Sequence, residues 1–233
     1  MNLSDYDAII VSGGKLDFDQ AYLSILETKR RRERENVCLI AADHGLDFMV
    51  HNKIRPNIVI GDFDSAGPDA LAFLEKEENS DRENRPQIIR LKPEKDISDT
   101  HAALIEAEKR GCKNVLLLGA TGTRLDHVTA NVLLLLKAKE AGMKLIICDP
   151  KNLIFLADDG MQLSKKSWGK YYVSFFPLGE PVEGLTLKGF QYPLNDFRLA
   201  LSEASLTISN RIIDDCAEVH FKSGNLVVMI TID

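Results

Sequence analysis

No segment of this sequence is long and apolar enough to cross a membrane, since none reaches the roughly 18 uninterrupted apolar residues that a spanning helix needs. The first residues, MNLSDYD, also lack the basic start and apolar stretch of a secretory signal. Cysteine is scarce: the four cysteines form no C-x-x-C pair and lie near no histidine cluster, which disfavours a zinc site or a disulfide framework. We therefore expect a cytoplasmic protein with reduced thiols and no membrane partner.

A surplus of basic residues is missing as well. The net charge of -6 disfavours a general affinity for nucleic acid, because binding to the phosphate backbone needs a basic face. One basic run, residues 29–34, lies at the end of a predicted helix, where cations complement the helix dipole, so we expect a solvated helix end there. The 233 residues, 45% of them hydrophobic, are enough for one large or two small globular domains.

Several common catalytic motifs are also absent. There is no G-x-x-x-x-G-K-[ST] segment, which excludes a P-loop enzyme, and no G-x-S-x-G nucleophile elbow. The fragment Gly119-Ala120-Thr121-Gly122 lacks the spacing of a dinucleotide-binding loop, so hydride transfer is not expected.

What is present, up to Pro150, is an alternation of short apolar runs with segments of helical period. The runs predict strands at Ala8–Ser12, Val37–Ala42, Ile58–Gly61, Gln87–Leu91, Val115–Gly119 and Lys144–Cys148. The periodic segments predict helices at Phe18–Arg32, Leu46–Val50, Asp69–Glu78, Ile97–Arg110 and Leu125–Ala141. Strands separated by helices indicate a mostly parallel sheet covered on both faces, a Rossmann-like α/β domain over residues 1–150.

Residues 151–233 lose the helical period and become rich in short β segments. We expect strands at Tyr171–Phe176, Leu185–Lys188, Leu206–Ser209, Ala217–Lys222 and Leu226–Ile232. The segment Phe221–Leu226 resembles a hairpin connection, because its Gly and Asn tolerate positive φ. A small antiparallel sandwich or barrel is predicted for this second domain.

The segment Gly61-Asp62-Phe63-Asp64-Ser65 carries the strongest chemical signal. It places two carboxylates just past a short buried strand, at a glycine where the backbone bends. Paired carboxylates repel each other unless a cation lies between them, and hard oxygen ligands suit Mg²⁺, which fills its other positions with water and phosphate. The sequence therefore predicts a magnesium-phosphate site at this strand end.

Other predicted strand ends carry similar side chains, and in parallel sheets ligands bind beyond the carboxyl ends of the strands. Asp96, Asp99 and Asp126 each lie near a helix start, where any one of them alone could be a helix cap. Their number favours one converged acidic site. The sequence also supplies the basic side chains Lys92, Lys95 and Arg124 and several glycine turns. Carboxylates, basic groups and glycine turns together suit an enzyme of phosphoryl-type transfer.

The motifs resemble those of bacterial thiamine pyrophosphokinases, in order and over nearly the whole chain. They are A-D-H-G at 42–45, P-N-I-V-I-G-D-F-D-S at 56–65, E-K-D-I-S-D at 94–99, G-A-T-G-T-R-L-D-H at 119–127 and S-L-T-I-S-N at 205–210. The resemblance implies Mg²⁺-dependent transfer of pyrophosphate from ATP to the hydroxyl of thiamine, giving thiamine diphosphate and AMP. It also implies a homodimer, in which an α/β catalytic domain (1–150) is followed by a β-sandwich (151–233) for thiamine binding and dimerisation, with thiamine at the interface.

The resemblance also implies a role for each matching residue. Catalytic and acidic-wall residues are Asp62, Asp64, Asp96, Asp99 and Asp126, of which the first four hold Mg²⁺. Nucleotide-binding residues are Gly13, Gly14, Lys95, Gly119, Thr121, Gly122 and Arg124, and thiamine-binding residues are Asp43, Ser205, Ser209 and Asn210. Asp99 and Asp126 are both candidates for the general base. The sequence departs from the family pattern at His44, where Gly is common, and at Ser98, where Thr is usual.

Two other functions stay open from the sequence. A related pyrophosphokinase acting on a hydroxymethylpterin would release AMP with a pterin but not with thiamine. A non-catalytic ATP-sensing module would bind Mg-ATP without turnover and could dispense with several of these aspartates, whereas all of them are present here.

Overall fold

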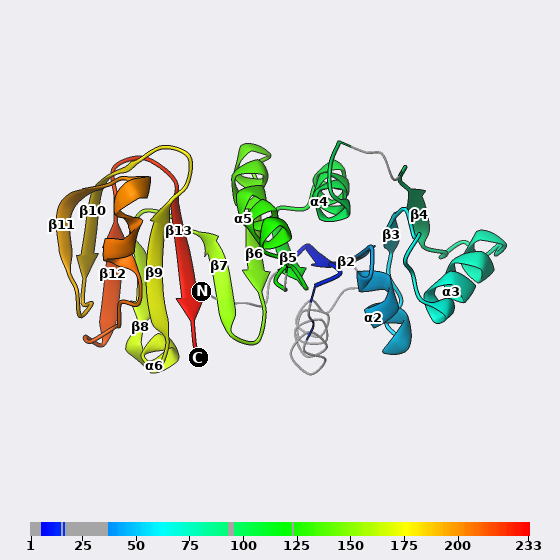
Figure 1. Ribbon diagram of the computed structural model, residues 1–233, viewed down its shortest axis with the longest axis horizontal. Coiled ribbons are helices and arrows are strands. Elements are labelled where there is room, and N and C mark those ends of the chain that lie inside the picture. Colours follow the sequence, from blue (N-terminus) through cyan, green and yellow to red (C-terminus); the bar gives the residue numbers. More distant parts are fainter. Residues whose placement is uncertain (1–5, 15, 17–36, 93–95, 123) are drawn as a thin grey trace. The chain divides into compact units, whose positions relative to one another are not determined.

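The chain divides into two compact units, Asn2–Pro150 and Lys151–Asp233 (Figure 1). A computed structural model describes residues 6–14, 16, 37–92, 96–122 and 124–233. The helix expected at Phe18–Arg32, the basic run 29–34 and Lys95 lie outside the described residues. No helix in the described part is long and apolar enough to span a bilayer.

In the described part of the N-terminal unit, all strand pairs are parallel and the strand order is β4-β3-β2-β1-β5-β6. Every residue of β1 and β3 is buried, because parallel strands with helices on both faces have no solvent side. This explains the continuous apolar runs of the sequence, and all the strands expected here are confirmed. Their bounds are β1 Ala8–Val11, β2 Cys38–Ala42, β3 Ile58–Gly61, β4 Gln87–Arg90, β5 Asn114–Leu118 and β6 Lys144–Cys148.

Helices cover both faces of this sheet. Figure 1 shows α4 and α5 on one side and α2 and α3 on the other. Their bounds are α2 Gly45–His51, α3 Pro68–Glu78, α4 Asp99–Lys109 and α5 Leu125–Glu140. Helix α4 begins two residues later than the expected Ile97, because Ser98 is its N-cap and accepts a hydrogen bond from the backbone N–H of His101 at 3.2 Å. Asp96 is therefore not the cap of this helix.

The strand order reverses direction at β1. From β1 the chain builds outward through β2, β3 and β4 on one side, and β5 and β6 are added on the other. Such a reversal opens a crevice beyond the carboxyl ends of the two strands that flank it, here β1 and β5. The segments that follow these strands are Ser12-Gly13-Gly14 and Gly119-Ala120-Thr121-Gly122, so the glycine-rich turns lie at the reversal.

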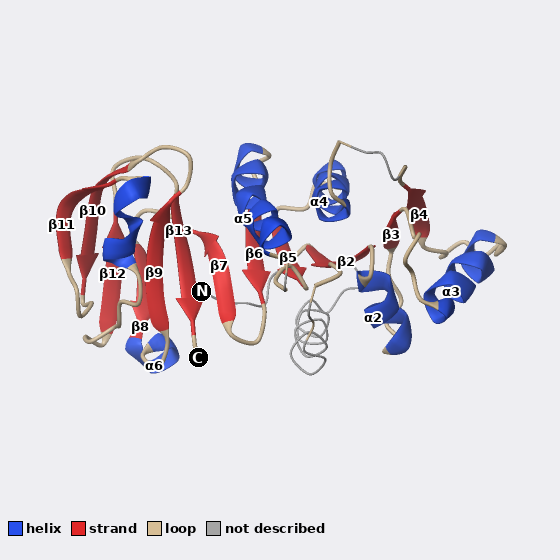
Figure 2. Ribbon diagram, viewed as in Figure 1, coloured by secondary structure: helices blue, strands red, loops and turns tan. Residues whose placement is uncertain are grey.

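The C-terminal unit contains two antiparallel sheets, β7-β13-β9 and β11-β10-β12-β8 (Figure 2). Their inner faces form a core in which the rings of Phe175 and Phe190 meet edge to face, with centroids 5.5 Å apart. The predicted sandwich is thus confirmed. The element bounds are β7 Asn152–Leu156, β8 Met161–Ser164, α6 Lys165–Trp168, β9 Tyr172–Pro177, β10 Val182–Lys188, β11 Leu194–Leu199, η1 Leu201–Thr207, β12 Cys216–His220 and β13 Leu226–Thr231.

The strand expected at Leu206–Ser209 is wrong. The segment ends the 3₁₀ helix η1, where the Thr207 hydroxyl donates to the carbonyl oxygens of Phe175 (2.5 Å) and Ala204 (3.0 Å). The strand was expected because apolar and polar residues alternate in this segment. Leu206 is 66% exposed, however, so the apolar residues do not form a buried face.

The hairpin expected at Phe221–Leu226 is also wrong, because β12 and β13 belong to different sheets. The connection first continues along β10: Lys222 N–H donates to the Glu183 carbonyl at 2.8 Å, and Glu183 N–H donates to the Ser223 carbonyl at 3.1 Å. The chain then turns at Gly224 (φ 100°) and crosses to the other sheet, where β13 pairs with both β7 and β9.

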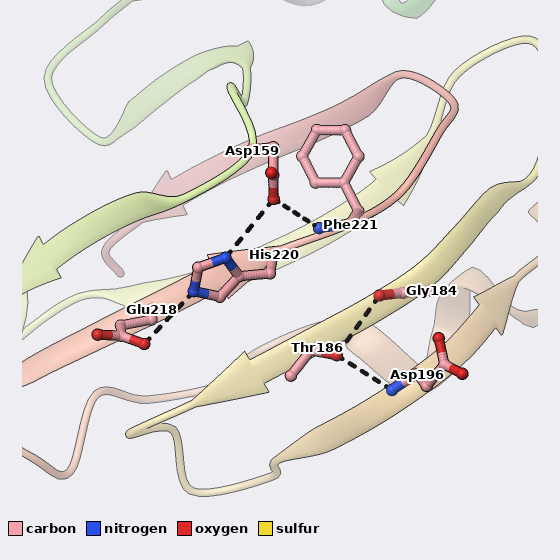
Figure 3. A network of polar contacts seen from close by, with 7 residues as sticks. All are labelled: Asp159, Gly184, Thr186, Asp196, Glu218, His220 and Phe221. Atoms are coloured by element: carbon pink, nitrogen blue, oxygen red, sulfur yellow. Dashed lines mark hydrogen bonds and ion pairs between the residues drawn. The ribbon is translucent and has the colours of Figure 1, made fainter.

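A polar network joins the turn after β7 to β12 on the four-stranded sheet (Figure 3). Oδ1 of Asp159 accepts a hydrogen bond from the Phe221 N–H at 3.0 Å and lies 3.6 Å from Nδ1 of His220. Nε2 of His220 lies 3.4 Å from Oε2 of Glu218. These contacts fix the turn 157–160 against β12 and are far from the glycine-rich turns in the sequence.

Candidate active site

A cavity of about 550 Å³ lies at the reversal of strand order, beyond the carboxyl ends of the strands. Loops after β1, β2, β3 and β5 and the first turns of α4 and α5 form its walls. Eight of the predicted site residues line it: Gly13, Gly14, Asp43, Asp99, Gly119, Thr121, Gly122 and Arg124. The structure thus brings together residues that the sequence separates by more than a hundred positions.

The glycine turns in this cavity are packed backbone to backbone. The Gly14 N–H donates to the Gly119 carbonyl at 2.7 Å, and a Cβ on Gly14 would lie 2.3 Å from the Thr121 carbonyl oxygen. Gly119 has φ 66°, and a Cβ there would lie 2.3 Å from the Ser12 carbonyl oxygen. Glycine is therefore required at both positions by close approach, and bare backbone of this kind suits phosphate groups.

Asp43 supplies a half-buried carboxyl to the cavity. The residue has φ 51°, and its backbone N–H donates to the Ile60 carbonyl at 2.9 Å, which places it directly beside the end of β3. Burial raises the pKa of the Asp43 carboxyl, and the negative charges of Asp99 and Asp62 raise it further, while His44 opposes the shift. The charges of Asp62 and Asp99 therefore reach the Asp43 carboxyl, and these three residues are called the acidic group below.

His44 connects two loops of the site. Its Nδ1 lies 3.1 Å from Oδ2 of Asp47, and its Nε2 lies 3.2 Å from Oγ of Ser65. The hydrogen bond with Asp47 is the main cause that raises the pKa of His44. The imidazole thus holds the Asp62–Ser65 turn against the start of α2.

The two aspartates of the Asp62–Ser65 turn are not equivalent. Phe63 between them is buried with φ 62°, so the backbone reverses within the motif. Asp62 is half-buried, and the Asp64 N–H donates to its Oδ1 at 3.4 Å, whereas the side chain of Asp64 is exposed. Neither residue lines the cavity wall, and neither does the exposed Asp96.

Arg124 and Asp126 form an exposed pair at the cavity rim. The guanidinium Nη2 donates to Oδ2 of Asp126 at 2.6 Å, and the side chains are 68% and 64% exposed. This hydrogen bond lowers the pKa of Asp126 to about 2. Asp126 lies in the first turn of α5, whose N-cap is Arg124, so Asp126 is not a cap and does not line the cavity.

Comparison with known proteins identifies this arrangement. A family model described as "Thiamin pyrophosphokinase, catalytic domain" matches residues 30–147, and another, "Thiamin pyrophosphokinase, vitamin B1 binding domain", matches residues 161–226. The thiamine pyrophosphokinase of Bacillus subtilis (strain 168) is 31% identical over 199 residues, which is 85% of this chain and 89% of that relative. This chain belongs to the thiamin pyrophosphokinase family.

Solved structures of thiamin pyrophosphokinases share the whole fold. The Bacillus subtilis crystal structure has a TM-score of 0.79 at 28% identity and covers 97% of this chain and 99% of its own. The Geobacillus thermodenitrificans structure has a TM-score of 0.76 at 28% identity and covers 97% of each chain. The predicted family, fold class and enzyme class are therefore confirmed.

The residues of the acidic wall fit the Mg²⁺ that the thiamin pyrophosphokinase family implies. Mg²⁺ usually takes one or two protein carboxylates and completes its coordination with water and phosphate oxygens. Asp43, Asp62 and Asp99 offer hard oxygen donors, and their mutual repulsion favours a bound cation. Within the described ranges, no three His, Cys, Asp or Glu side chains form a group that could hold a metal by themselves.

The predicted thiamine-binding residues of the C-terminal unit differ in exposure. Ser205, within η1, and Ser209, just after it, are exposed. Asn210 is only 2% exposed, and its Oδ1 accepts hydrogen bonds from the N–H groups of Tyr192 (3.0 Å) and Arg211 (2.9 Å). Its Nδ2 donates to the Tyr192 carbonyl at 2.8 Å, so the amide is engaged with the backbone, and its contact with thiamine stays a prediction.

Asn210→Ala is expected to lower the free energy of unfolding by about 3 kcal/mol, because it removes the three hydrogen bonds that the buried amide makes with the backbone of residues 192 and 211. Urea denaturation of the full chain measures this. Asn195→Ala, at an exposed position in β11, serves as the control and should change the free energy by less than about 0.5 kcal/mol. Equal stability of the two variants would contradict the structural role of Asn210.

Several cavity residues were assigned no binding or catalytic role from the sequence. Ser12, Thr100, His127 and Asn131 line the wall, and Asn131 donates from its buried Nδ2 to the Ala120 carbonyl at 2.8 Å. The signal that could have found Ser12 is its place between a strand and two glycines. No sequence pattern predicts a role for Asn131. It lies within α5, and only the fold brings its side chain to the loop after β5.

Proposed function

We propose that this family member transfers the pyrophosphoryl group of ATP to the hydroxyl of thiamine at the β1/β5 cavity. The observation that carries the proposal is that four of the family's motifs each place residues on the wall of one cavity of about 550 Å³, among them Asp43, Ser65, Asp99 and the glycine turn at 119–122. Its size suits a nucleotide, and its walls combine carboxylates with closely packed backbone. The same proposal assigns nucleotide and metal binding to residues 1–150 and thiamine binding to residues 151–233.

In this reaction the thiamine hydroxyl oxygen forms a bond to the β-phosphorus, and the bond from that phosphorus to the oxygen bridging to the α-phosphorus breaks, releasing AMP. Of the four aspartates expected to bind Mg²⁺, Asp62 and Asp99 would hold the ion beside Asp43, with water and phosphate oxygens as its other ligands. Asp64 and Asp96 would lie at the exposed edge of this acidic group. The ion, when bound, neutralises charge on the transferred group and on the departing AMP.

The chain's own residues position the phosphates and the proton. The turns at Gly13–Gly14 and Gly119–Gly122 let phosphate oxygens approach the backbone, and Arg124 offers a planar fork to a phosphate from the rim. Asp99 receives the proton of the thiamine hydroxyl. We assign this role to Asp99 rather than Asp126, because Asp99 lines the cavity and Asp126 does not.

The proposal includes a homodimer in which thiamine binds between subunits, near Ser205 and Ser209. What supports it is exposed apolar surface: Leu201, Leu206 and Ile208 of the C-terminal unit are 67%, 66% and 47% exposed. The proposal also includes the cytoplasmic location expected from the sequence.

Leu206→Asp is expected to convert the dimer to a monomer, because a charge at the centre of an apolar contact is desolvated without a partner. Sedimentation velocity at micromolar concentration measures the change. Leu71→Asp, at an equally apolar exposed position of α3, is the control and should leave the dimer intact. A monomeric parent protein, or a Leu206→Asp variant that remains dimeric, would contradict the assignment of this surface.

Chromatographic detection of AMP from Mg-ATP, with and without thiamine, tests the reaction itself. Thiamine-dependent AMP and an equal amount of thiamine diphosphate are expected. AMP release that depends on a hydroxymethylpterin instead would assign the chain to the related pyrophosphokinases, and binding of ATP without turnover would assign it a sensing role.

A further inference from the structure

We infer that the hydroxyls of Ser12 and Thr100 form a positioning pair for the nucleotide: the pair fixes Asp99 against the Gly13–Gly14 turn and presents a hydroxyl proton to the phosphates. This inference rests on the proposed function of the cavity. It concerns residues outside the motif aspartates and glycines, one following β1 and the other in the first turn of α4.

The pair is a buried link between segments far apart in the chain. Oγ of Ser12 and Oγ1 of Thr100 lie 2.7 Å apart across 88 residues, each residue is 7% exposed, and both line the cavity. A hydroxyl–hydroxyl hydrogen bond of this length is well formed. It crosses from the end of β1 to the first turn of α4 and lies at the cavity wall.

On one side of the link is the glycine turn. The Ser12 N–H donates to the Leu118 carbonyl at 2.8 Å and the Gly14 N–H donates to the Gly119 carbonyl at 2.7 Å, so Ser12 is held on the β5 loop from both directions. On the other side, Thr100 directly follows Asp99 in the helix capped by Ser98. The link therefore sets the distance between the acidic group and the backbone that faces the phosphates.

One proton of the pair is left over. Each hydroxyl carries a single proton, so when one donates to the other, the accepting hydroxyl keeps its own proton for a further acceptor. Among the residues that the structure describes, neither hydroxyl makes another hydrogen bond. The N-terminal end of the 11-residue helix α4, which favours negative charge, lies at the same place. A phosphate oxygen in the cavity is the acceptor that this geometry suits.

Binding of Mg²⁺ with α,β-methylene ATP tests the inference, because the analogue cannot lose AMP and binding is measured without turnover. In titration calorimetry on the full chain, Thr100→Val, which keeps the shape but removes the hydroxyl, should bind about tenfold more weakly or worse. Thr100→Ser should bind within about threefold of the parent, because the hydroxyl is retained. Ser12→Ala combined with Thr100→Val should bind about as weakly as Thr100→Val alone, since the two hydroxyls act as a unit.

Thr207→Val is the matched control. Thr207 is also a buried threonine, 2% exposed with a bonded hydroxyl, but it lies in the C-terminal unit. The Thr207→Val variant should have a lower midpoint of thermal unfolding, as Thr100→Val should. Its affinity for the analogue should be unchanged. Parent-like affinity of Thr100→Val would overturn the inference, and so would a Thr100→Ser variant as weak as Thr100→Val. Failure of the unaltered protein to bind the analogue would overturn the proposed function as well, a result visible before any substitution.

Discussion

Asp62→Ala is expected to reduce the formation of AMP from Mg-ATP and thiamine by at least about a hundredfold, because it removes a carboxylate that neutralises Mg²⁺ at the phosphates. Asp62 lies just past β3, is half-buried, and its charge reaches Asp43 across the site. Alanine offers no oxygen to the cation, and neighbouring carboxylates cannot replace it without moving the turn that Phe63 holds at positive φ. Chromatography of the nucleotide products under saturating ATP measures the loss.

The control for this variant is Asp69→Ala. Asp69 is an exposed aspartate in the first turn of α3, so the same chemical change is made outside the site. The activity of Asp69→Ala should stay within about twofold of the parent. The thermal unfolding midpoint of Asp62→Ala should stay near that of the parent, because the loss of charge repulsion offsets the loss of the hydrogen bond from the Asp64 N–H. An Asp62→Ala variant with more than half of the parent activity would exclude Asp62 from metal binding.

Gly14→Ala should lose both stability and nucleotide affinity. The added methyl group would lie 2.3 Å from the Thr121 carbonyl oxygen and 2.4 Å from that of Gly119, and neither backbone atom can move freely. We expect the free energy of unfolding to fall by about 3 kcal/mol from overpacking. Forcing the two turns apart displaces the phosphate-facing backbone by a distance of the order of 1 Å, which costs about a hundredfold in rate.

Gly111→Ala distinguishes this steric effect from backbone strain. Gly111 has φ 75°, and a Cβ there would have no neighbour within 4 Å, so only the left-handed conformation is penalised, by about 1 kcal/mol. Its AMP formation should equal that of the parent. If Gly14→Ala behaves like Gly111→Ala in both stability and activity, the close packing of the two turns is not what the reaction requires.

Sequence periodicity predicted the N-terminal sheet well, because parallel strands covered on both faces must be apolar throughout. β1 and β3 show this directly, with every residue buried. The start of α4 was placed two residues early, since Ile97 continues the apolar pattern and only the hydrogen bond from His101 N–H to Ser98 identifies the cap.

The C-terminal unit was harder to predict, because its pairings are decided by contacts between distant segments. β11 has two adjacent exposed residues at 195 and 196, and the register of its pairing with β10 shifts twice, so the strand has no alternation to detect. The turn residues after β12 favoured a hairpin, yet backbone hydrogen bonds to Glu183 extend that segment along β10 instead. Local preference was overridden by tertiary pairing.

For the site, the sequence predicted which loops converge but not how each side chain is used. The adjacency of Asp62 and Asp64 suggested equal ligands, whereas the reversal at Phe63 exposes only the second of them. Asn210 matched a binding motif, yet its amide is satisfied by backbone groups that only the folded sheet brings near. Hydrogen-bond partners of this kind depend on three-dimensional register, which spacing does not encode.

The position of β13 between β7 and β9 has a consequence for biosynthesis. During translation, β7 and β9 leave the ribosome some fifty residues or more before their shared partner is made, so both strand edges stay unpaired for that interval. Exposed edges are sites of aggregation, and non-local pairings form slowly. The C-terminal unit therefore completes its folding last, and chaperone binding to nascent chains should be concentrated on residues 152–177 until β13 arrives.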